Sequence, residues 1–194
     1  MLMVMGGLFV ILLSFDMGIK QYIESTYKEK EEHETMIDKV VFRKVYNKGF
    51  ILNGVPTPLR GVSRHQDQLY KGNALTREEH FQDAKIIKEL GANTIRLAHY
   101  QHSQDFYDAC DELGFIVWAE IPFISVMNPD PAAHQNCITQ MKELILQNYN
   151  HTSICFWGVS NEILIGGISD QLVENHKQLQ KLCKELDPTR LTTI

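Results

Sequence analysis

The sequence predicts an α/β protein built on a parallel sheet, and three observations indicate this class. From Phe50 onward, short apolar segments typical of strands alternate with longer segments that have helical periodicity. The segment from Ile154 to Val159 is almost continuously apolar, as expected for a strand that is buried on both faces. No glycine-rich phosphate loop follows any of these strands, which weakens the alternative of a nucleotide-binding, doubly wound sheet.

The composition excludes several classes of protein. The chain has 194 residues, with 19 Lys and Arg against 24 Asp and Glu, and its formal net charge is −5. This acidic balance argues against electrostatic binding of nucleic acid, and 22% charged residues with 44% hydrophobic residues argue against disorder. The four cysteines are scattered, so we expect reduced core residues and neither a disulfide nor a zinc site; they are Cys110, Cys137, Cys155 and Cys183.

The first 39 residues differ from the rest of the chain. The apolar run from Met1 to Phe15 has no basic residue before it, and Asp16 ends it well short of the ~20 apolar residues that a membrane span needs. A charged stretch from Lys28 to Glu34 follows, which is typical of a solvated linker. We therefore expect an apolar leader and charged linker over 1–39, a catalytic domain over 40–194, no membrane partner, and a cytoplasmic protein.

The first elements of the domain are predicted from turn and capping residues. Asn53-Gly54 suits a tight hairpin turn between Phe50–Leu52 and the segment 58–62. A helix begins after Thr76, whose hydroxyl can cap it together with Glu79 three residues later, and it ends at 91.

The following elements repeat the alternation of strand and helix. Strands are expected at 94–98, 115–119, 154–159 and from 191, and helices at 104–113, after Pro131, and at 170–186. The helix after Pro131 is expected to bury one apolar face, made of Cys137, Met141, Leu144 and Ile145. After the leader, the chain has room for four β/α units and a fifth strand.

Each predicted strand ends in polar residues. The carboxyl ends of parallel strands meet at one edge, where β/α proteins place their chemistry. Arg96 lies mid-strand on the face of Thr94 and Ala98, so its guanidinium needs a carboxylate, either Glu120 or one from a strand outside the chain. The polar strand ends are residues 63–67, 99–100, 120 and 160–162. Their position at the carboxyl ends of the strands favours a barrel. Two acids, two histidines and an arginine converging at one edge suit glycoside hydrolysis.

Simpler interpretations exist for several of these residues. The Asn161-Glu162 pair is also typical of a helix cap. His99 and His102 form an H-x-x-H pattern that is weak evidence for a metal at a strand end. Trp118 and Trp157 could stack on a sugar, but large aromatics in apolar strands are more often core residues.

From Phe42 to Ile194 the sequence resembles glycoside hydrolase family 2, and within it the bacterial β-galactosidases. The matching motifs occur in family order: 49-GFILNG-54, 60-RGVSRHQD-67, 91-GANTIRLAHY-100, 110-CDELGFIVWAE-120 and 157-WGVSNE-162. The resemblance implies the N-terminal half of a (β/α)8 TIM barrel, truncated during the fifth strand. It also implies that Val40 to Val45 is the tail of a preceding domain.

The resemblance also implies catalytic roles. Glu162 would be the general acid/base of a retaining hydrolase, with a pKa that burial and a neighbouring nucleophile should raise. Arg96 would pair with the nucleophilic carboxylate, which the family carries on a strand beyond Ile194. The isolated chain is therefore expected to be an inactive fragment.

The substrate implied by the resemblance is a terminal β-galactoside. Asn161 would bond the sugar 2-hydroxyl, His99 and His65 would line the sugar subsite, and Glu120 would support it. The family's metal-dependent members have Glu and His after the third strand, where this chain has 121-IPFIS-125, so we expect no metal and no cofactor. We expect the complete protein to be oligomeric.

Two alternatives to a β-galactosidase remain open. One is a β-glucuronidase, whose motifs are similar; the motif Arg64-His65-Gln66-Asp67 favours the galactosidase. The other is a non-catalytic remnant that only binds sugar or assembles with a complementary fragment.

Overall fold

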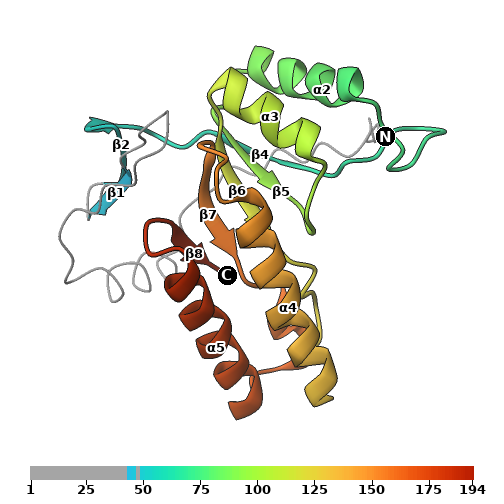
Figure 1. Ribbon diagram of the computed structural model, residues 1–194, viewed down its shortest axis with the longest axis vertical. Coiled ribbons are helices and arrows are strands. Elements are labelled where there is room, and N and C mark those ends of the chain that lie inside the picture. Colours follow the sequence, from blue (N-terminus) through green and yellow to red (C-terminus); the bar gives the residue numbers. More distant parts are fainter. Residues whose placement is uncertain (1–42, 47–48) are drawn as a thin grey trace.

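A computed structural model describes residues 43–46 and 49–194 (Figure 1). Two sheets are present among them. An antiparallel sheet has the order β1-β2-β3, with strands Arg43–Tyr46, Gly49–Leu52 and Val55–Pro56. A parallel sheet has the order β4-β5-β6-β7-β8, with strands Gly61–Arg64, Thr94–Leu97, Ile116–Glu120, Ile154–Gly158 and Leu191–Thr193.

Helices connect the strands of the parallel sheet. They are α2 (Arg77–Glu89), α3 (Gln104–Leu113), α4 (Pro131–Asn148) and α5 (Asp170–Leu186), with a short 3-10 helix η1 (Ile163–Gly166) after β7. The strands lie in the sheet in the same order as in the sequence, whereas a doubly wound sheet reverses its order at a switch point. The architecture is thus α/β with the topology of part of a β/α barrel, as predicted.

The helix boundaries follow from the capping residues. Thr76 and Glu79 form the expected capping box at the start of α2, each side chain bonding the other's backbone N–H. Gly114 ends α3 in the left-handed region, with φ 67°, which residues other than glycine rarely adopt. These local signals explain why the helices start and stop within a residue or two of the predicted positions.

The outer face of the parallel sheet is covered by helices and contains the main core. Alternate strand residues point to this side, among them Ile95, Val117 and Trp157, and all three are fully buried. Helix α4 packs Met141, Leu144 and Ile145 against them, as expected, while Cys137 is only partly buried. All four cysteines are free thiols, and the other three are buried in strands or helices.

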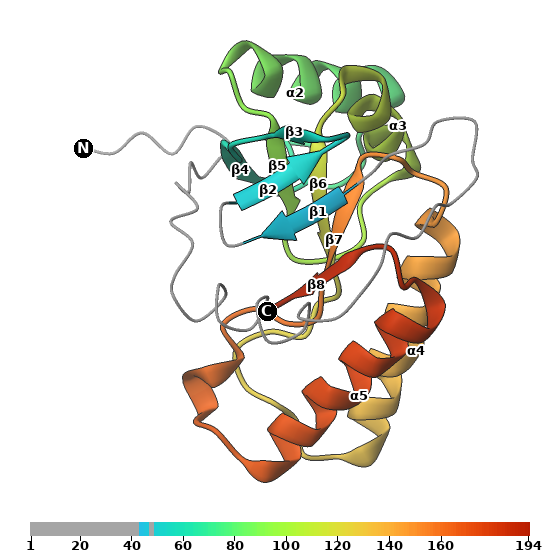
Figure 2. The ribbon, with the colours of Figure 1, turned by 90° about the vertical axis from the view of Figure 1, so that its left-hand side faces the viewer.

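Among the described residues, those that cover the inner face of the sheet lie at its amino-terminal end. Figure 2 shows the small antiparallel sheet lying across the parallel strands. Phe50 of β2 packs there against Ile116, Phe156 and Leu191, with Trp118 at the margin. The inner face is therefore apolar near the strand starts and becomes polar toward their carboxyl ends, which leaves that edge available for a site.

One local prediction is wrong. The hairpin turn at Asn53-Gly54 is present, with both residues at positive φ, but its second strand is Val55–Pro56 rather than 58–62. Two-residue turns pair the strands that flank them directly, so the chain after Pro56 is released to enter the parallel sheet. Of the segment Val40 to Val45, expected as the tail of a preceding domain, the described part belongs to Arg43–Tyr46, which pairs with β2. The predicted leader over 1–39 lies outside the described residues.

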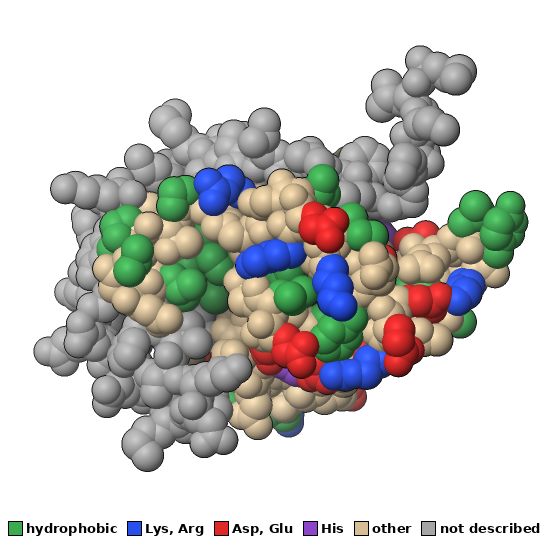
Figure 3. Space-filling model, turned by 90° about the horizontal axis from the view of Figure 1, so that it is seen from above, with side chains coloured by type: hydrophobic (Ala, Val, Ile, Leu, Met, Phe, Trp, Pro, Cys, Tyr) green, Lys and Arg blue, Asp and Glu red, His purple; other side chains and the backbone are tan. Residues whose placement is uncertain are grey.

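The surface carries charges of both signs. Figure 3 shows Lys and Arg side chains interspersed with Asp and Glu on the face seen from above. Arg77 of α2, for example, contacts Asp105 and Asp108 of α3 at 2.8 Å each. Among residues 43–46 and 49–194, no helix has the length and apolar character required to cross a membrane.

Candidate active site

The centre of the candidate site is an ion pair between neighbouring strands. Arg96 lies mid-strand in β5 and Glu120 ends β6, on the same face of the sheet. The Arg96 Nε and Nη2 atoms lie 2.8 and 2.9 Å from the two carboxylate oxygens of Glu120, whose side chain is fully buried. This two-point pairing compensates the buried charge of Glu120. Of the two partners considered for Arg96, the structure therefore shows Glu120.

His99 binds the same carboxylate. Its Nδ1 lies 2.6 Å from Oε1 of Glu120 and 3.4 Å from Nη2 of Arg96. The contact with Glu120 is much the shorter, and a carboxylate only accepts, so Nδ1 carries the hydrogen and donates it to Glu120 rather than accepting from Arg96. Glu120 thus orients the imidazole, whose Nε2 makes no hydrogen bond to any residue of the described ranges.

Asn161 joins this cluster from the end of β7. Its Oδ1 accepts a hydrogen bond of 2.6 Å from Arg96 Nη2. Its backbone N–H donates to the Phe123 carbonyl, and its own carbonyl accepts from Ser125, so the loop after β6 holds it at both backbone groups. With Oδ1 committed to Arg96, the Nδ2 amide group of Asn161 can donate to a ligand.

Glu162 follows directly and has a different environment. It lies in the left-handed region, with φ 50°, and its side chain is exposed. Within the described residues its carboxyl group therefore lacks the burial expected of an acid/base. Glu162 precedes η1 but makes no side-chain cap hydrogen bond, so the alternative of a simple helix cap is wrong.

His65 lies beside this cluster. It follows β4, and its ring packs edge-on against His99 with centroids 5.2 Å apart. The Tyr100 ring also lies near His65, with centroids 5.9 Å apart and the hydroxyl 3.5 Å from His65 Nδ1. Burial and then the neighbouring His99 lower the pKa of His65 below its usual 6.5, which favours a neutral ring near neutral pH.

Trp118 is a site residue that the sequence analysis left between core and sugar platform. It pairs with Arg96 across β5 and β6, and the guanidinium carbon lies 4.6 Å from the centre of the indole ring. Gly158 on β7 makes room for this arrangement, since an added Cβ would lie 2.6 Å from Glu120 Cβ and would clash with Trp118 Nε1. A sequence signal was present, because Trp118 and Glu120 share a face by the period of two.

Other candidate residues serve the fold. Trp157 is fully buried, and its indole N–H donates to Asp187. His102 is buried against Arg64 and bonds the Ala98 carbonyl, so it does not pair with His99. Among the described residues no group of three or more His, Cys, Asp or Glu is arranged to hold a metal ion.

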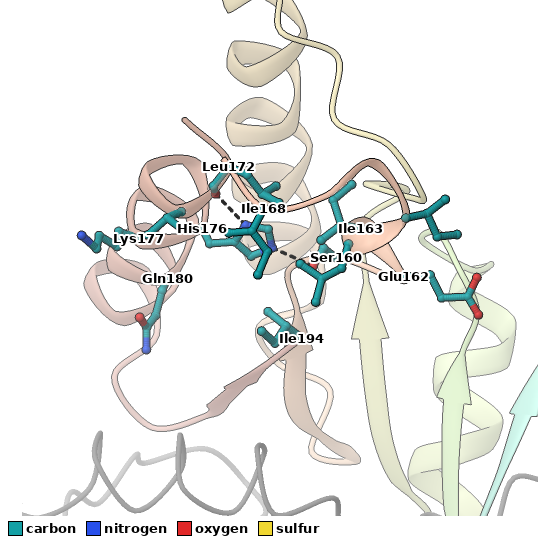
Figure 4. A pocket seen from close by; sticks show the side chains of 12 residues that line it. Ser160, Glu162, Ile163, Ile168, Leu172, His176, Lys177, Gln180 and Ile194 are labelled. Carbon is teal, nitrogen blue, oxygen red and sulfur yellow. Dashed lines mark hydrogen bonds between the residues drawn. The ribbon is translucent and has the colours of Figure 1, made fainter. Parts of the chain in front are cut away.

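A pocket of about 810 Å³, which Glu162 also lines, lies between η1, α5 and the end of β8. Figure 4 shows Ser160 bonded to His176 within it, while the Glu162 carboxylate points away from its centre. The rest of its lining is mostly aliphatic, including Ile168 and Ile194. A sugar needs many hydrogen-bonding partners, so the polar cluster around Arg96 is the better candidate site.

The structure thus brings four predicted residues into one hydrogen-bonded cluster; these are Arg96, His99, Glu120 and Asn161. His65 packs against this cluster, and Glu162 is adjacent to Asn161 in the chain. The cluster offers a cation, oriented histidines and a free amide donor beside an exposed carboxyl group, which are groups suited to binding a polyhydroxylated ligand and transferring a proton to it.

Comparison with known proteins gives the family. The family description "Glycosyl hydrolases family 2, TIM barrel domain" matches residues 43–194. A β-glucuronidase of Bacteroides fragilis is 46% identical over 154 residues, covering 76% of this chain and 22% of the relative. A β-galactosidase of Thermoanaerobacterium thermosulfurigenes is 40% identical over 162 residues, covering 80% of this chain and 21% of the relative.

A solved structure is more similar still. The crystal structure described as an FMN-binding β-glucuronidase from Faecalibacterium prausnitzii L2-6 has a TM-score of 0.78 and 74% sequence identity, over 79% of this chain and 24% of that one. The chain therefore spans less than a quarter of the length of these relatives. It belongs to glycoside hydrolase family 2, and its described residues form part of the TIM-barrel domain of that family.

Proposed function

We propose that these residues form the acid/base half of the active site of a retaining glycoside hydrolase that acts on β-glucuronides. The observation that carries the proposal is the cluster of Arg96, Glu120, His99 and Asn161 beside the exposed Glu162. Glu162 acts as the general acid/base, and the Asn161 amide bonds the sugar 2-hydroxyl. His65 and His99 line the sugar subsite, and Glu120 orients His99.

The chemistry assigns two successive tasks to Glu162. In the first step its carboxyl group protonates the glycosidic oxygen while a nucleophilic carboxylate attacks the anomeric carbon, and in the second it takes a proton from the attacking water. Glu120 is a poor nucleophile because both its oxygens accept hydrogen bonds from Arg96 and one also accepts from His99. The nucleophile of the proposed enzyme accordingly belongs to a strand outside this chain, where Arg96 can support it.

The preference for glucuronides replaces the β-galactoside expected from the sequence. That expectation depended on the motif Arg64-His65-Gln66-Asp67. Arg64 is buried between α2 and α3, where it binds Asp83. The Gln66 side chain accepts a hydrogen bond of 2.8 Å from the backbone N–H of Ser103. Two of the four motif residues therefore stabilise the fold and give no information about the sugar. The relatives with 46% and 74% identity are named β-glucuronidases, which supports the proposal; the 40% identical relative keeps β-galactosides as the second candidate.

A chimeric enzyme tests the proposal directly. Residues 43–194 would replace the matching segment of the Faecalibacterium protein, and hydrolysis of nitrophenyl β-glucuronide and β-galactoside would be measured. We expect glucuronide hydrolysis that Glu162→Gln lowers by about 10²–10⁴-fold in kcat, the usual contribution of a general acid/base. Glu143→Gln, an exposed carboxylate on α4, is the matched control and should leave kcat unchanged.

Two outcomes would contradict the proposal. A folded chimera without hydrolytic activity would indicate a remnant that only binds or assembles. A chimera that prefers the galactoside would restore the second candidate.

A further inference from the structure

Arg64 makes four side-chain hydrogen bonds and one ring contact, yet it lies outside the cluster around Arg96. The register pairs Ser63 with Arg96, so Arg64, the next residue of β4, points to the opposite face of the sheet. Its side chain is only 3% exposed and lies between α2 and α3. The guanidinium stacks on Phe106 at 3.8 Å from the ring centre.

The guanidinium has one anionic partner and two histidine partners. Nη2 lies 2.6 Å from Asp83 of α2 and 3.1 Å from Nδ1 of His80, while Nη1 lies 3.2 Å from Nδ1 of His102. Arginine can only donate, so both Nδ1 atoms must accept. Both histidines are therefore neutral here, and burial followed by the charge of Arg64 lowers the pKa of each.

His102 connects this cluster to the candidate site. Because its Nδ1 accepts from Arg64, its Nε2 carries the hydrogen and donates it to the Ala98 carbonyl at 3.2 Å. The Ala98 N–H in turn donates to the backbone carbonyl of Arg64 at 3.0 Å. Ala98 is thus held at both backbone groups, and the next residue is His99, whose ring binds Glu120.

The same cluster also places His65. This residue directly follows Arg64 and packs against His99 at 5.2 Å. His65 is thus the chain neighbour of Arg64 itself. His99 is the chain neighbour of Ala98, whose carbonyl is bonded by His102, a partner of Arg64.

We infer that Arg64, acting through His102, is a positioning residue that sets the rings of His65 and His99 in the candidate site. The inference rests on the proposed function for what the two rings do, but the geometry that it predicts is measurable without any substrate. Arg64 does not touch the ligand. It transmits the placement of α2 and α3 to the carboxyl edge of the sheet.

Nuclear magnetic resonance of the histidine rings tests this in the full chain of 194 residues. Arg64→Lys keeps the charge but cannot reach three partners, and it should move the ring ¹⁵N resonances of both His65 and His99. Arg77→Lys is the matched control, because Arg77 also links α2 to α3 but contacts only Asp105, Asp108 and the Phe81 ring. It should leave both rings unchanged.

The readout separates positioning from stability alone. An Arg64→Lys variant that loses thermal stability but keeps both ring resonances would overturn the inference, since the residue would then only stabilise the fold. His102→Gln gives a second variant, which should move the His99 ring more than that of His65.

The wild-type chain provides a test that needs no variant. At pH 5, His102 must remain neutral with its hydrogen on Nε2, and a protonated His102 ring at this pH would overturn the inference. An inactive chimera combined with responsive His65 and His99 rings would refute the proposed function and leave the positioning role standing.

Discussion

The Asn161 carboxamide oxygen accepts a 2.6 Å hydrogen bond from the Arg96 guanidinium, across the intervening strand β6. This bond turns the amide nitrogen of Asn161 outward beside Glu162. The same guanidinium donates hydrogen bonds from two nitrogens to the two carboxylate oxygens of Glu120. One mid-strand residue therefore organises side chains from three strands, and the predictions below begin with it.

Replacing Arg96 with Met should strongly destabilise the chain. The buried Glu120 carboxylate would lose its two-point partner, and an uncompensated buried charge is costly. Because the Arg96 side chain is 15% exposed, we expect a loss of about 2–4 kcal/mol in the free energy of unfolding, measured with urea. Arg77→Met, which removes exposed ion pairs, should have a much smaller effect; equal losses would contradict the role of burial.

Stability should fall as the pH is lowered from about 6.5 toward 3. Burial and then Arg64 lower the pKa of His102 from 6.5 to about 3. In this window the unfolded chain binds a proton at His102 that the folded chain does not, so acid favours unfolding by up to about 1.4 kcal/mol per pH unit from this group. His102→Gln should flatten the dependence measured by urea unfolding at pH 7, 6 and 5. Equal slopes in the two proteins would contradict the prediction.

Gly158→Ala should disturb the inner face of the sheet. The added Cβ would lie 2.6 Å from Glu120 Cβ and would also clash with the Trp118 ring nitrogen. We expect a loss of about 1–3 kcal/mol in unfolding free energy and a changed tryptophan fluorescence spectrum. Gly72→Ala, whose added Cβ meets nothing within 4 Å, should leave the spectrum unchanged, and an unaltered Gly158→Ala spectrum would count against the crowding.

The chain should associate in solution through its apolar pocket. Ile165 and Ile168 on this surface are 67% and 74% exposed, and both line the pocket. The double variant Ile165→Asp/Ile168→Asp should lower the sedimentation coefficient toward that of a monomer. Leu69→Asp, at an equally exposed site on another loop, should not do so, and a wild-type chain that sediments as a monomer would refute the prediction.

The chain of 194 residues should not hydrolyse nitrophenyl glycosides by itself. Glu162 is the proposed acid/base, and we propose that the nucleophile lies outside the chain. Activity of the purified chain that Glu162→Gln abolishes would show that the described residues and their neighbours already contain a complete site.

Much of the fold was predictable because its signals are local. Helix signals act within a few residues, so capping and periodicity were enough to locate the helices. Examples are the capping box of Thr76 and Glu79, the end of α3 at Gly114, and the apolar spacing of α4. The hairpin partner was wrong because Asn53-Gly54 specifies a turn, while the length of the strand after it depends on where the chain next finds a pairing partner.

The sequence identified the polar residues that form the candidate site and offered Glu120 as one possible partner of Arg96, but it left the other pairings open. Arg96 and Glu120 were identified because charged residues in a buried sheet are unusual. Trp118 and Gly158 were not assigned, because an aromatic or a glycine in an apolar strand has several uses. The contrast between Arg64 and Arg96 depends on which face of the sheet each occupies, and the register between β4 and β5 settles it.

The sequence by itself determined the α/β class, the positions of the helices and parallel strands, and the polar residues at their carboxyl ends, because spacing and residue type carry that information. Only the tertiary structure decided that Glu120 holds both Arg96 and His99, that Arg64 faces the helices, and that Glu162 is exposed. These outcomes depend on contacts between residues 16 to 65 positions apart, and no local pattern encodes which of several possible partners a side chain meets.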